Sequence, residues 1–211
     1  MYNERLLRLL AETQIPKVFL DTSSLVAPDE LNGDLLLMES RTSVRRITCH
    51  LLEQGRTLPG FIGDIGYAQS NRERYEGFCQ ALTDAGKKVD SSLCLTTPLG
   101  IDTYREEIDT FLSSLSRMPD AFVCASDYVA CILMQLLEKR GLRVPEDVAV
   151  SGFDNNTEDL LAEHLTTVQV FNEELGARLA LQILYRIKYP NTPHEVTYLG
   201  TNVLYRDSTG D

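Results

Sequence analysis

The chain has 211 residues, of which 43% are hydrophobic and 24% are charged, so it can bury a core and is not a disordered chain. Its net charge of −11 excludes a bare duplex-binding domain, which needs basic side chains to neutralise phosphates, and argues against docking on anionic membranes. The five cysteines form no C-x-x-C pair, and neither a signal peptide nor a membrane-spanning stretch is visible, so we expect free thiols in a cytoplasmic protein.

Short apolar runs alternate with helical patterns along the whole chain. In the first half, the patterns predict a helix around residues 6–10, strands at 17–20 and 35–38, a helix over 42–53, a strand at 58–62, and a helix that Ser70 and Glu73 open as a capping box. In the second half, they predict a strand at 89–95, a helix opened by a second capping box of Thr103 and Glu106, a strand at 121–125, a helix over 129–137, a strand at 148–151, a long helix capped by Asn172, and strands at 195–199 and 202–205. Strands separated by helices indicate parallel β-α-β units and an α/β fold.

The helix predicted over residues 129–137 is apolar at every position except Gln135. A helix that is apolar all round is buried on more than one side. Two interpretations stay open at this point: the helix forms part of a dimer face, or it is a core helix of the monomer.

Carboxylates follow four of the predicted strands. Asp21, Asp64, Asp127 and Asp154 each come directly after an apolar run or one to two residues beyond it. Because ligands of α/β sheets bind outside the carboxyl ends of the strands, these four side chains are candidates for one shared site. Each aspartate taken alone is better explained as a helix N-cap, and the four together bring a shared site level with that explanation, so both stay open at this point.

The helix after Asp64 brings Arg72 and Arg74 towards the same edge of the sheet. A carboxylate accepts hydroxyl protons and a guanidinium offers a planar fork of donors, so this set suits a polyhydroxylated or polar cyclic ligand. The three histidines have no metal-type spacing, and no nucleophile elbow, Cys/His pairing or phosphate loop is present. The sequence therefore predicts no catalytic residue, no metal and no cofactor.

Several segments, in their order, resemble the motifs of the LacI/GalR family of transcriptional regulators. They are LLEQGR at 51–56, GFIG at 60–63, SNRERYEGF at 70–78, PDAFVCASD at 119–127, GLRVPEDVAVSGFDN at 141–155, and LTTV at 165–168. Arg56 stands where the family usually has histidine, and Ser126 where it usually has asparagine. Each motif is weak alone, but their order and their coverage of nearly the whole chain make the resemblance specific.

The resemblance implies an α/β, periplasmic-binding-protein-like core of two doubly wound parallel-sheet subdomains, the amino-terminal one incomplete, joined by three crossing strands. Residues 1–36 and 168–201 are expected to be the remnant of the amino-terminal subdomain, and residues 37–167 and 202–211 the carboxy-terminal one. The helix-turn-helix and the first strands of such a protein are missing from this sequence. Half of the ligand cleft is then missing too, which leaves open whether the chain binds ligand alone.

Carried over position by position, the resemblance implies that the effector contacts Arg74, Asp154, Asp21 and Ser126. Serine is a shorter donor and acceptor than asparagine, which points to a different ligand or an intervening water. The pattern of strand ends and the helix after Asp64 leave three secondary candidates, namely Asp64, Arg72 and Asp127.

The implied function is the effector-sensing core of a LacI-type regulator. A small polar, sugar-like effector would control how a homodimer holds operator DNA through a helix-turn-helix that this chain lacks. One alternative is a solute-binding protein of a sugar transporter, which the missing export signal and lipidation cysteine disfavour. Another is a carboxylate-dependent α/β enzyme using Asp64 and Asp127, for which no base, nucleophile or metal is apparent.

Overall fold

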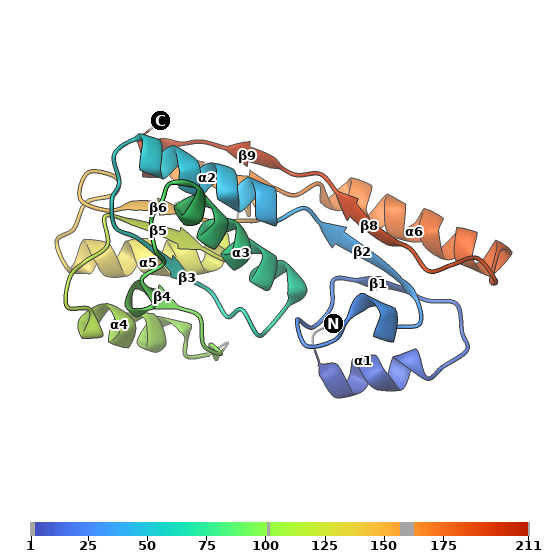
Figure 1. Cartoon of the computed structure of the whole chain (residues 1–211). Helices are drawn as coiled ribbons and strands as arrows, with labels where there is room; N and C mark the ends of the chain where they lie inside the picture. The colour runs from blue at the N-terminus through green and yellow to red at the C-terminus, as the bar shows by residue number, and fades with distance from the viewer. Residues whose placement is uncertain (1–2, 101, 157–162, 211) are drawn as a thin grey trace.

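The computed structural model describes residues 3–100, 102–156 and 163–210, and it places two α/β parts at opposite ends of the molecule (Figure 1). The part at the right of Figure 1 is built on a three-stranded parallel sheet, and the part at the left on a four-stranded parallel sheet. The predicted α/β fold is confirmed.

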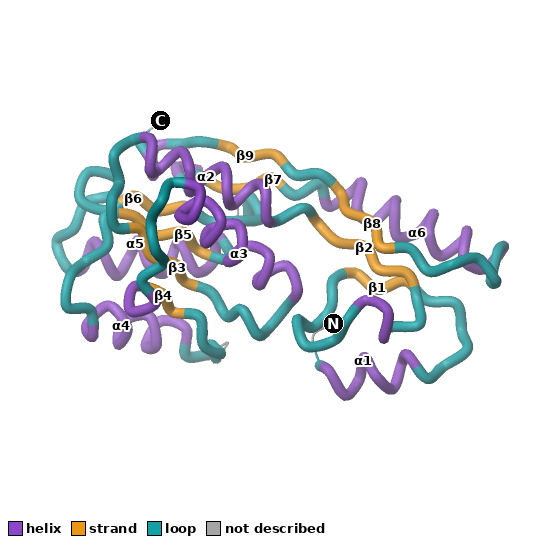
Figure 2. The backbone as a smooth tube through the Cα atoms, in the orientation of Figure 1, coloured by secondary structure: helices purple, strands orange, loops and turns teal. Residues whose placement is uncertain are grey.

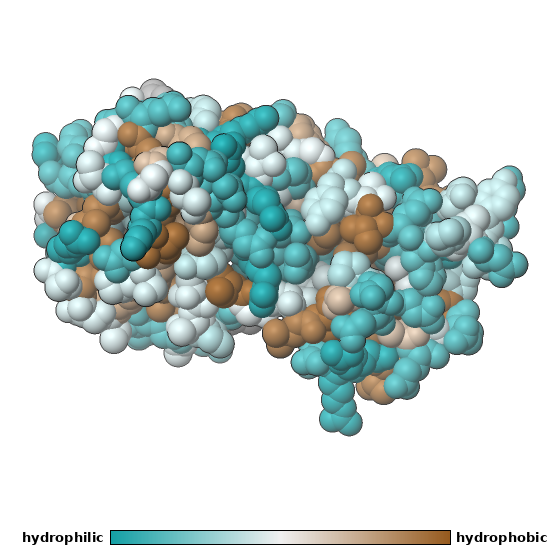
Figure 3. Space-filling view, viewed as in Figure 1, coloured by the Kyte–Doolittle hydropathy of each residue, from teal (hydrophilic) through white to brown (hydrophobic). Residues whose placement is uncertain are grey.

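The three-stranded sheet joins segments from both ends of the sequence. Its strands, in the order in which they pair, are β1 (Val18–Leu20), β2 (Asp34–Met38) and β8 (Val196–Leu199), and its helices are α1 (Glu4–Ala11) and α6 (Asn172–Lys188). A small core fills the space between α1 and the sheet, made of Leu7, Phe19, Val26, Leu31, Leu35 and Leu37. On the outside of α6, Leu181, Leu184 and Ile187 are exposed, and the surface view shows apolar patches among polar residues on both parts (Figure 3).

The four-stranded sheet is covered by helices on both faces. Its strands, in pairing order, are β4 (Cys94–Leu95), β3 (Pro59–Ile62), β5 (Ala121–Cys124) and β6 (Ala149–Ser151), and its helices are α2 (Arg41–Glu53), α3 (Gln69–Asp84), α4 (Tyr104–Ser114) and α5 (Asp127–Lys139). Side chains alternate along each strand, so Phe122 packs with α4 and α5, and Phe61 packs with α2 and α3. The two apolar faces explain why β3, β5 and β6 are buried at every position.

Three segments cross between the two sheets, and Figure 2 shows them as loops beside the strands. The first crossing follows β2, the second follows the strand β7 (Thr167–Gln169), and the third follows β8 and leads into β9 (Asn202–Leu204). β7 and β9 pair with each other in antiparallel orientation. β2 ends at Met38, and residues 168–169 lie in β7. β7 is a strand that the sequence analysis missed.

The helix over residues 129–137 is a core helix. In α5, Val129 to Leu133 and Leu136 to Leu137 are buried between the sheet and α4, whereas Tyr128 is 59% exposed. The monomer itself therefore covers this apolar helix, and the dimer-face interpretation of it is wrong.

Two of the predicted helix starts are wrong in detail, and a third lacks its predicted bonds. α3 begins at Gln69 after the N-cap Ala68, and Asn172 is the first residue of α6, not its cap. Thr103 is the N-cap of α4, but its hydroxyl donates to Glu107 and makes no capping bond. The side chains of Ser70 and Thr103 have different partners from those that the spacing suggested.

The predicted strand over 89–95 is mostly a 3₁₀ turn, Ser91–Leu93, followed by the two residues of β4. Further 3₁₀ turns are Pro28–Glu30 and Asp207–Thr209. In the described part of the chain, no helix combines the length and the apolar character needed to cross a bilayer.

Candidate functional site

Arg74 and Asp154 face each other at the carboxyl ends of β5 and β6. Arg74 projects from α3 and is 5% exposed. Its Nη1 donates to the carbonyl oxygen of Ala125, its Cζ lies 3.7 Å above the ring of Phe153, and its Nη2 is 3.7 Å from Oδ1 of Asp154. The guanidinium is thus fixed by backbone and ring contacts, with a carboxylate at its edge.

Asp154 combines partial exposure with an uncommon backbone conformation. Its φ is 114°, and its backbone N–H donates to the carbonyl oxygen of Val168 over 3.1 Å. Its side chain is 44% exposed, so it can still reach a ligand. Burial raises the pKa of the carboxyl, and the charge of Arg74 opposes that rise. A non-glycine residue held at positive φ is a feature that clusters at functional sites.

Ser126 lies next to this pair as the N-cap of α5. Its Oγ accepts the backbone N–H of Val129 over 3.3 Å, and the side chain is half-buried. The capping bond uses the oxygen as an acceptor and leaves the hydroxyl proton available to donate. The residue before it, Ala125, supplies the carbonyl that holds Arg74.

Asp127 uses its carboxylate inside the protein. The hydroxyl of Thr167 donates to Oδ1 over 2.6 Å, and the backbone N–H of Asn156 donates to Oδ2 over 2.8 Å. Burial raises the pKa of Asp127 to about 6, with a smaller push from Asp154, against the lowering effect of the two hydrogen bonds. The carboxylate ties the loop after β6 and the strand β7 to the start of α5.

Asp21 lies at the end of β1, in the other sheet, and is 1% exposed. The hydroxyl of Ser70 donates to its Oδ2 over 2.6 Å, and its Oδ1 accepts the backbone N–H groups of Thr22 at 2.7 Å and of Ser70 at 3.4 Å. The carboxylate therefore links the three-stranded sheet to the first turn of α3.

Asp64 and Arg72 have more local roles. Oδ1 of Asp64 accepts the backbone N–H groups of Gly66 and Tyr67, which closes the turn before α3. Arg72 points from α3 towards the loop after β1, where its Nη2 is 3.4 Å from Oγ of Ser24. Arg72 and Arg74 thus face different neighbours although they lie two residues apart.

The structure brings the sequence-predicted residues together in two groups joined by α3. Arg74, Ser126, Asp127 and Asp154 gather at the ends of β5 and β6. Asp21 and Arg72 meet at the junction between α3 and the loop after β1. Asp64 closes the turn that leads into α3.

Sequence reasoning missed three participants. The capping-box spacing indicates a helix cap at Ser70, and nothing in a single sequence pairs this residue with Asp21. Phe153, the ring under Arg74, precedes Asp154 directly, so its place beside the site was visible in the sequence. Tyr198 of β8 donates its hydroxyl to Glu73 over 2.8 Å and adds another contact between the two parts. In the parts of the chain described, no group of three or more metal-ligating side chains is placed to hold a metal ion.

Comparisons with known proteins agree with this geometry. A family model described as a periplasmic binding protein-like domain matches residues 48–209. The HTH-type transcriptional regulator DegA of Bacillus subtilis (strain 168) is 31% identical over 170 residues, which cover 80% of this chain and 48% of DegA. The HTH-type transcriptional repressor PurR of Aliivibrio fischeri (strain MJ11) is 29% identical over 209 residues, or 98% of this chain and 61% of that protein.

A solved structure, the transcriptional regulator CelR in complex with cellobiose, has a TM-score of 0.79 and 26% identity, and covers 97% of this chain and 69% of CelR. The chain spans about half to three fifths of the length of DegA and PurR. These relatives are transcriptional regulators, so the expectation of a regulator core and not an enzyme is confirmed. The chain belongs to the family of periplasmic binding protein-like domains and is an effector-binding core of the LacI type.

Proposed function

We propose that this chain senses a small polar, sugar-like effector for a LacI-type transcriptional regulator that acts in the cytoplasm. The observation that carries the proposal is the Arg74–Asp154 pair. A buried guanidinium, fixed by Ala125 and Phe153, stands 3.7 Å from a carboxylate that is still 44% exposed. Adjacent hydroxyls of a sugar can accept from such a donor and donate to such an acceptor at the same time. The binding of cellobiose by CelR supports a sugar as the class of ligand.

Each candidate residue has its own part in this proposal. Arg74 and Asp154 hold the effector, and Ser126 donates its free hydroxyl proton to it. Asp21 joins from the opposite side by exchanging the Ser70 hydroxyl for a hydroxyl of the effector. Three residues position the others without touching the ligand, and these are Asp64, Arg72 and Asp127.

The two sheets belong to two subdomains that, in this proposal, move relative to each other when the effector binds. We assign residues 1–36 and 168–201 to one subdomain and residues 37–167 and 202–211 to the other, with the crossing segments as the hinge. An effector that contacts Asp21 on one side and Arg74 on the other favours the arrangement in which the two sides are close. In a full-length homodimer, this shift would change how two helix-turn-helix units hold operator DNA.

Isothermal titration of the chain with a panel of sugars that includes cellobiose and D-ribose tests the proposal. We expect saturable binding of at least one sugar, and at least about tenfold weaker binding after Arg74→Ala, which removes charge-assisted bonds. Arg46→Ala, an exposed arginine on α2, is the matched control and should leave affinity unchanged. A panel with no binding, or equal binding by both variants, would refute the assignment.

A further inference from the structure

A cavity lies at the opposite edge of the four-stranded sheet from Arg74 and Asp154. It has a volume of about 650 Å³ and opens beside Pro59, where β3 begins, whereas the Arg74 site lies where β5 and β6 end. Leu82, in the last turns of α3, forms part of its wall. The two sites are therefore separated by the length of the strands.

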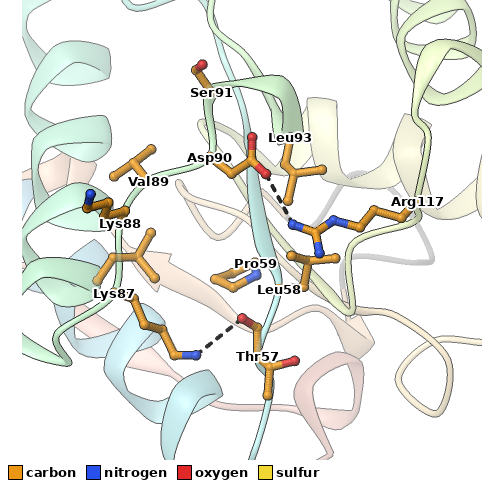
Figure 4. A pocket seen from close by; sticks show the side chains of 11 residues that line it. Thr57, Leu58, Pro59, Lys87, Lys88, Val89, Asp90, Ser91, Leu93 and Arg117 are labelled. Carbon is orange, nitrogen blue, oxygen red and sulfur yellow. Dashed lines mark hydrogen bonds and ion pairs between the residues drawn. The ribbon is translucent and has the colours of Figure 1, made fainter.

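The cavity has an apolar floor and a cationic rim. The floor is formed by Leu58, Pro59, Leu82, Val89 and Leu93, and the rim carries Lys87, Lys88 and Arg117 with Asp90 as the one carboxylate. Figure 4 shows Lys87 and Arg117 on opposite sides of Leu58 and Pro59. Three cations against one carboxylate are unexpected on a chain whose net charge is −11.

The cations of the rim retain donor capacity. Nη2 of Arg117 donates to Asp90 over 3.2 Å, and Nζ of Lys87 makes a long, 3.3 Å bond to the carbonyl oxygen of Thr57. Among the residues that the structure describes, Lys88 has no hydrogen-bond partner, and neither do Nε and Nη1 of Arg117. A guanidinium with an unused edge is a ready binding site for phosphate or carboxylate oxygens.

We propose that this cavity is a second ligand site, which takes a small organic anion with an apolar body. The apolar floor buries the body of the ligand, and cations of the rim hold its anionic group. The volume lies in the range of small-molecule sites. A long polyanion such as nucleic acid would meet the acidic remainder of the surface, so the chemistry favours a compact ligand. The site is independent of the proposed effector site.

Phenyl phosphate is a suitable probe, because it combines an apolar ring with a phosphate group. Phenol carries the ring without the phosphate, and inorganic phosphate is the anion without the ring. Isothermal titration of the whole chain should show saturable binding of phenyl phosphate, at least about tenfold tighter than the binding of phenol or of inorganic phosphate. The double variant Lys88→Ala/Arg117→Ala should lose at least about tenfold in affinity. Arg5→Ala/Lys188→Ala, which removes the same charges from α1 and α6, should bind like the unmodified chain.

Three results would overturn the proposal. They are the absence of saturable binding to the unmodified chain, equal affinity in the two double variants, and inorganic phosphate binding as tightly as phenyl phosphate. Equal midpoints of thermal unfolding for the two double variants would show that a loss of affinity is not caused by unfolding of the variant. Amide shifts of Leu58 and Leu93 in NMR spectra on adding phenyl phosphate locate the binding, and their absence during saturable binding would also count against this cavity.

Discussion

The hydroxyl of Ser70 donates to the carboxylate of Asp21 over 2.6 Å, although the two residues belong to parts of the molecule built on different sheets. Both side chains are buried, at 5% and 1% exposure. Around this bond, the backbone N–H of Gln69 donates to the carbonyl oxygen of Thr22 over 2.8 Å. The first turn of α3 is therefore fastened to the loop after β1 by a buried, charge-assisted bond.

Ser70→Ala should destabilise the chain because Asp21 keeps its charge in a buried place and loses one of its donors. We expect a loss of about 1.5–3 kcal/mol in the free energy of unfolding, the range for hydrogen bonds to charged groups. Urea denaturation measures it. Ser113→Ala is the control, since that exposed hydroxyl bonds to the carbonyl oxygen of Asp109 and to Arg140 at the surface. Equal effects of the two substitutions would contradict a special role of the Asp21–Ser70 bond.

Asp127 should make stability fall as the pH rises from about 4 to 7. Its pKa in the folded chain is about 6, above the ordinary value of 3.8, so the folded state binds the proton more tightly than the unfolded state does. A shift of about two pKa units corresponds to about 3 kcal/mol, which is present below the unfolded pKa and lost as the pH passes the folded one.

Urea denaturation of the chain and of Asp127→Asn at a series of pH values isolates this contribution. The uncharged amide cannot titrate, so the difference in unfolding free energy should move in favour of the variant as the pH rises. The raised pKa of Asp154 acts in the same direction and is common to both proteins. Curves that stay parallel over the whole range would show that Asp127 does not titrate there.

Removing one partner of the buried ion pair between Asp34 and Arg186 should strongly destabilise the fold. Nε and Nη2 of Arg186 donate to the two oxygens of Asp34 over 3.0 and 2.5 Å, and the side chains are 4% and 1% exposed. Burial alone would raise the pKa of Asp34, but the bonds from Arg186, Gln182 and the backbone N–H of Glu195 lower it. Arg186→Leu should destabilise by about 3–5 kcal/mol, because it leaves a buried charge unpaired.

Asp34→Leu/Arg186→Leu should recover a large part of that loss, because no buried charge remains in the double variant. A double-mutant cycle by urea denaturation gives the coupling between the two residues. The absence of coupling would mean that the pair contributes nothing beyond its two separate side chains.

Gly77 is required by the close approach of α2 and α3. A methyl group at this position would lie 2.2 Å from the carbonyl oxygen of Arg41, and backbone atoms cannot move aside cheaply. Gly77→Ala should therefore destabilise by about 1–3 kcal/mol. Gly176→Ala in α6 meets nothing within 4 Å and should stabilise by about 0.5–1 kcal/mol through helix propensity. Thermal unfolding compares the two variants, and a shift of the same sign in both would rule out this steric explanation.

Periodicity predicted most helices and strands because their apolar faces are long enough to show a repeat. β7 was not predicted because it has only three residues, of which Gln169 is polar, and because its partner strand β9 lies far along the chain. The ends of strands likewise located Asp154 and Asp127 correctly at one edge. The sequence could not reveal that Thr167 and Asn156 occupy the carboxylate of Asp127 while Asp154 stays half-exposed, since those partners depend on how distant loops meet.

The pairing of β2 with β8 determines the order in which the two sheets can form during synthesis of the chain. Leu36 lies opposite Thr197, so the third strand of this sheet is synthesised long after the strand with which it pairs. The four-stranded sheet, by contrast, has all its strands by Ser151. During synthesis, one end of the molecule can be finished while the other still presents an open strand edge, the kind of surface on which nascent chains aggregate.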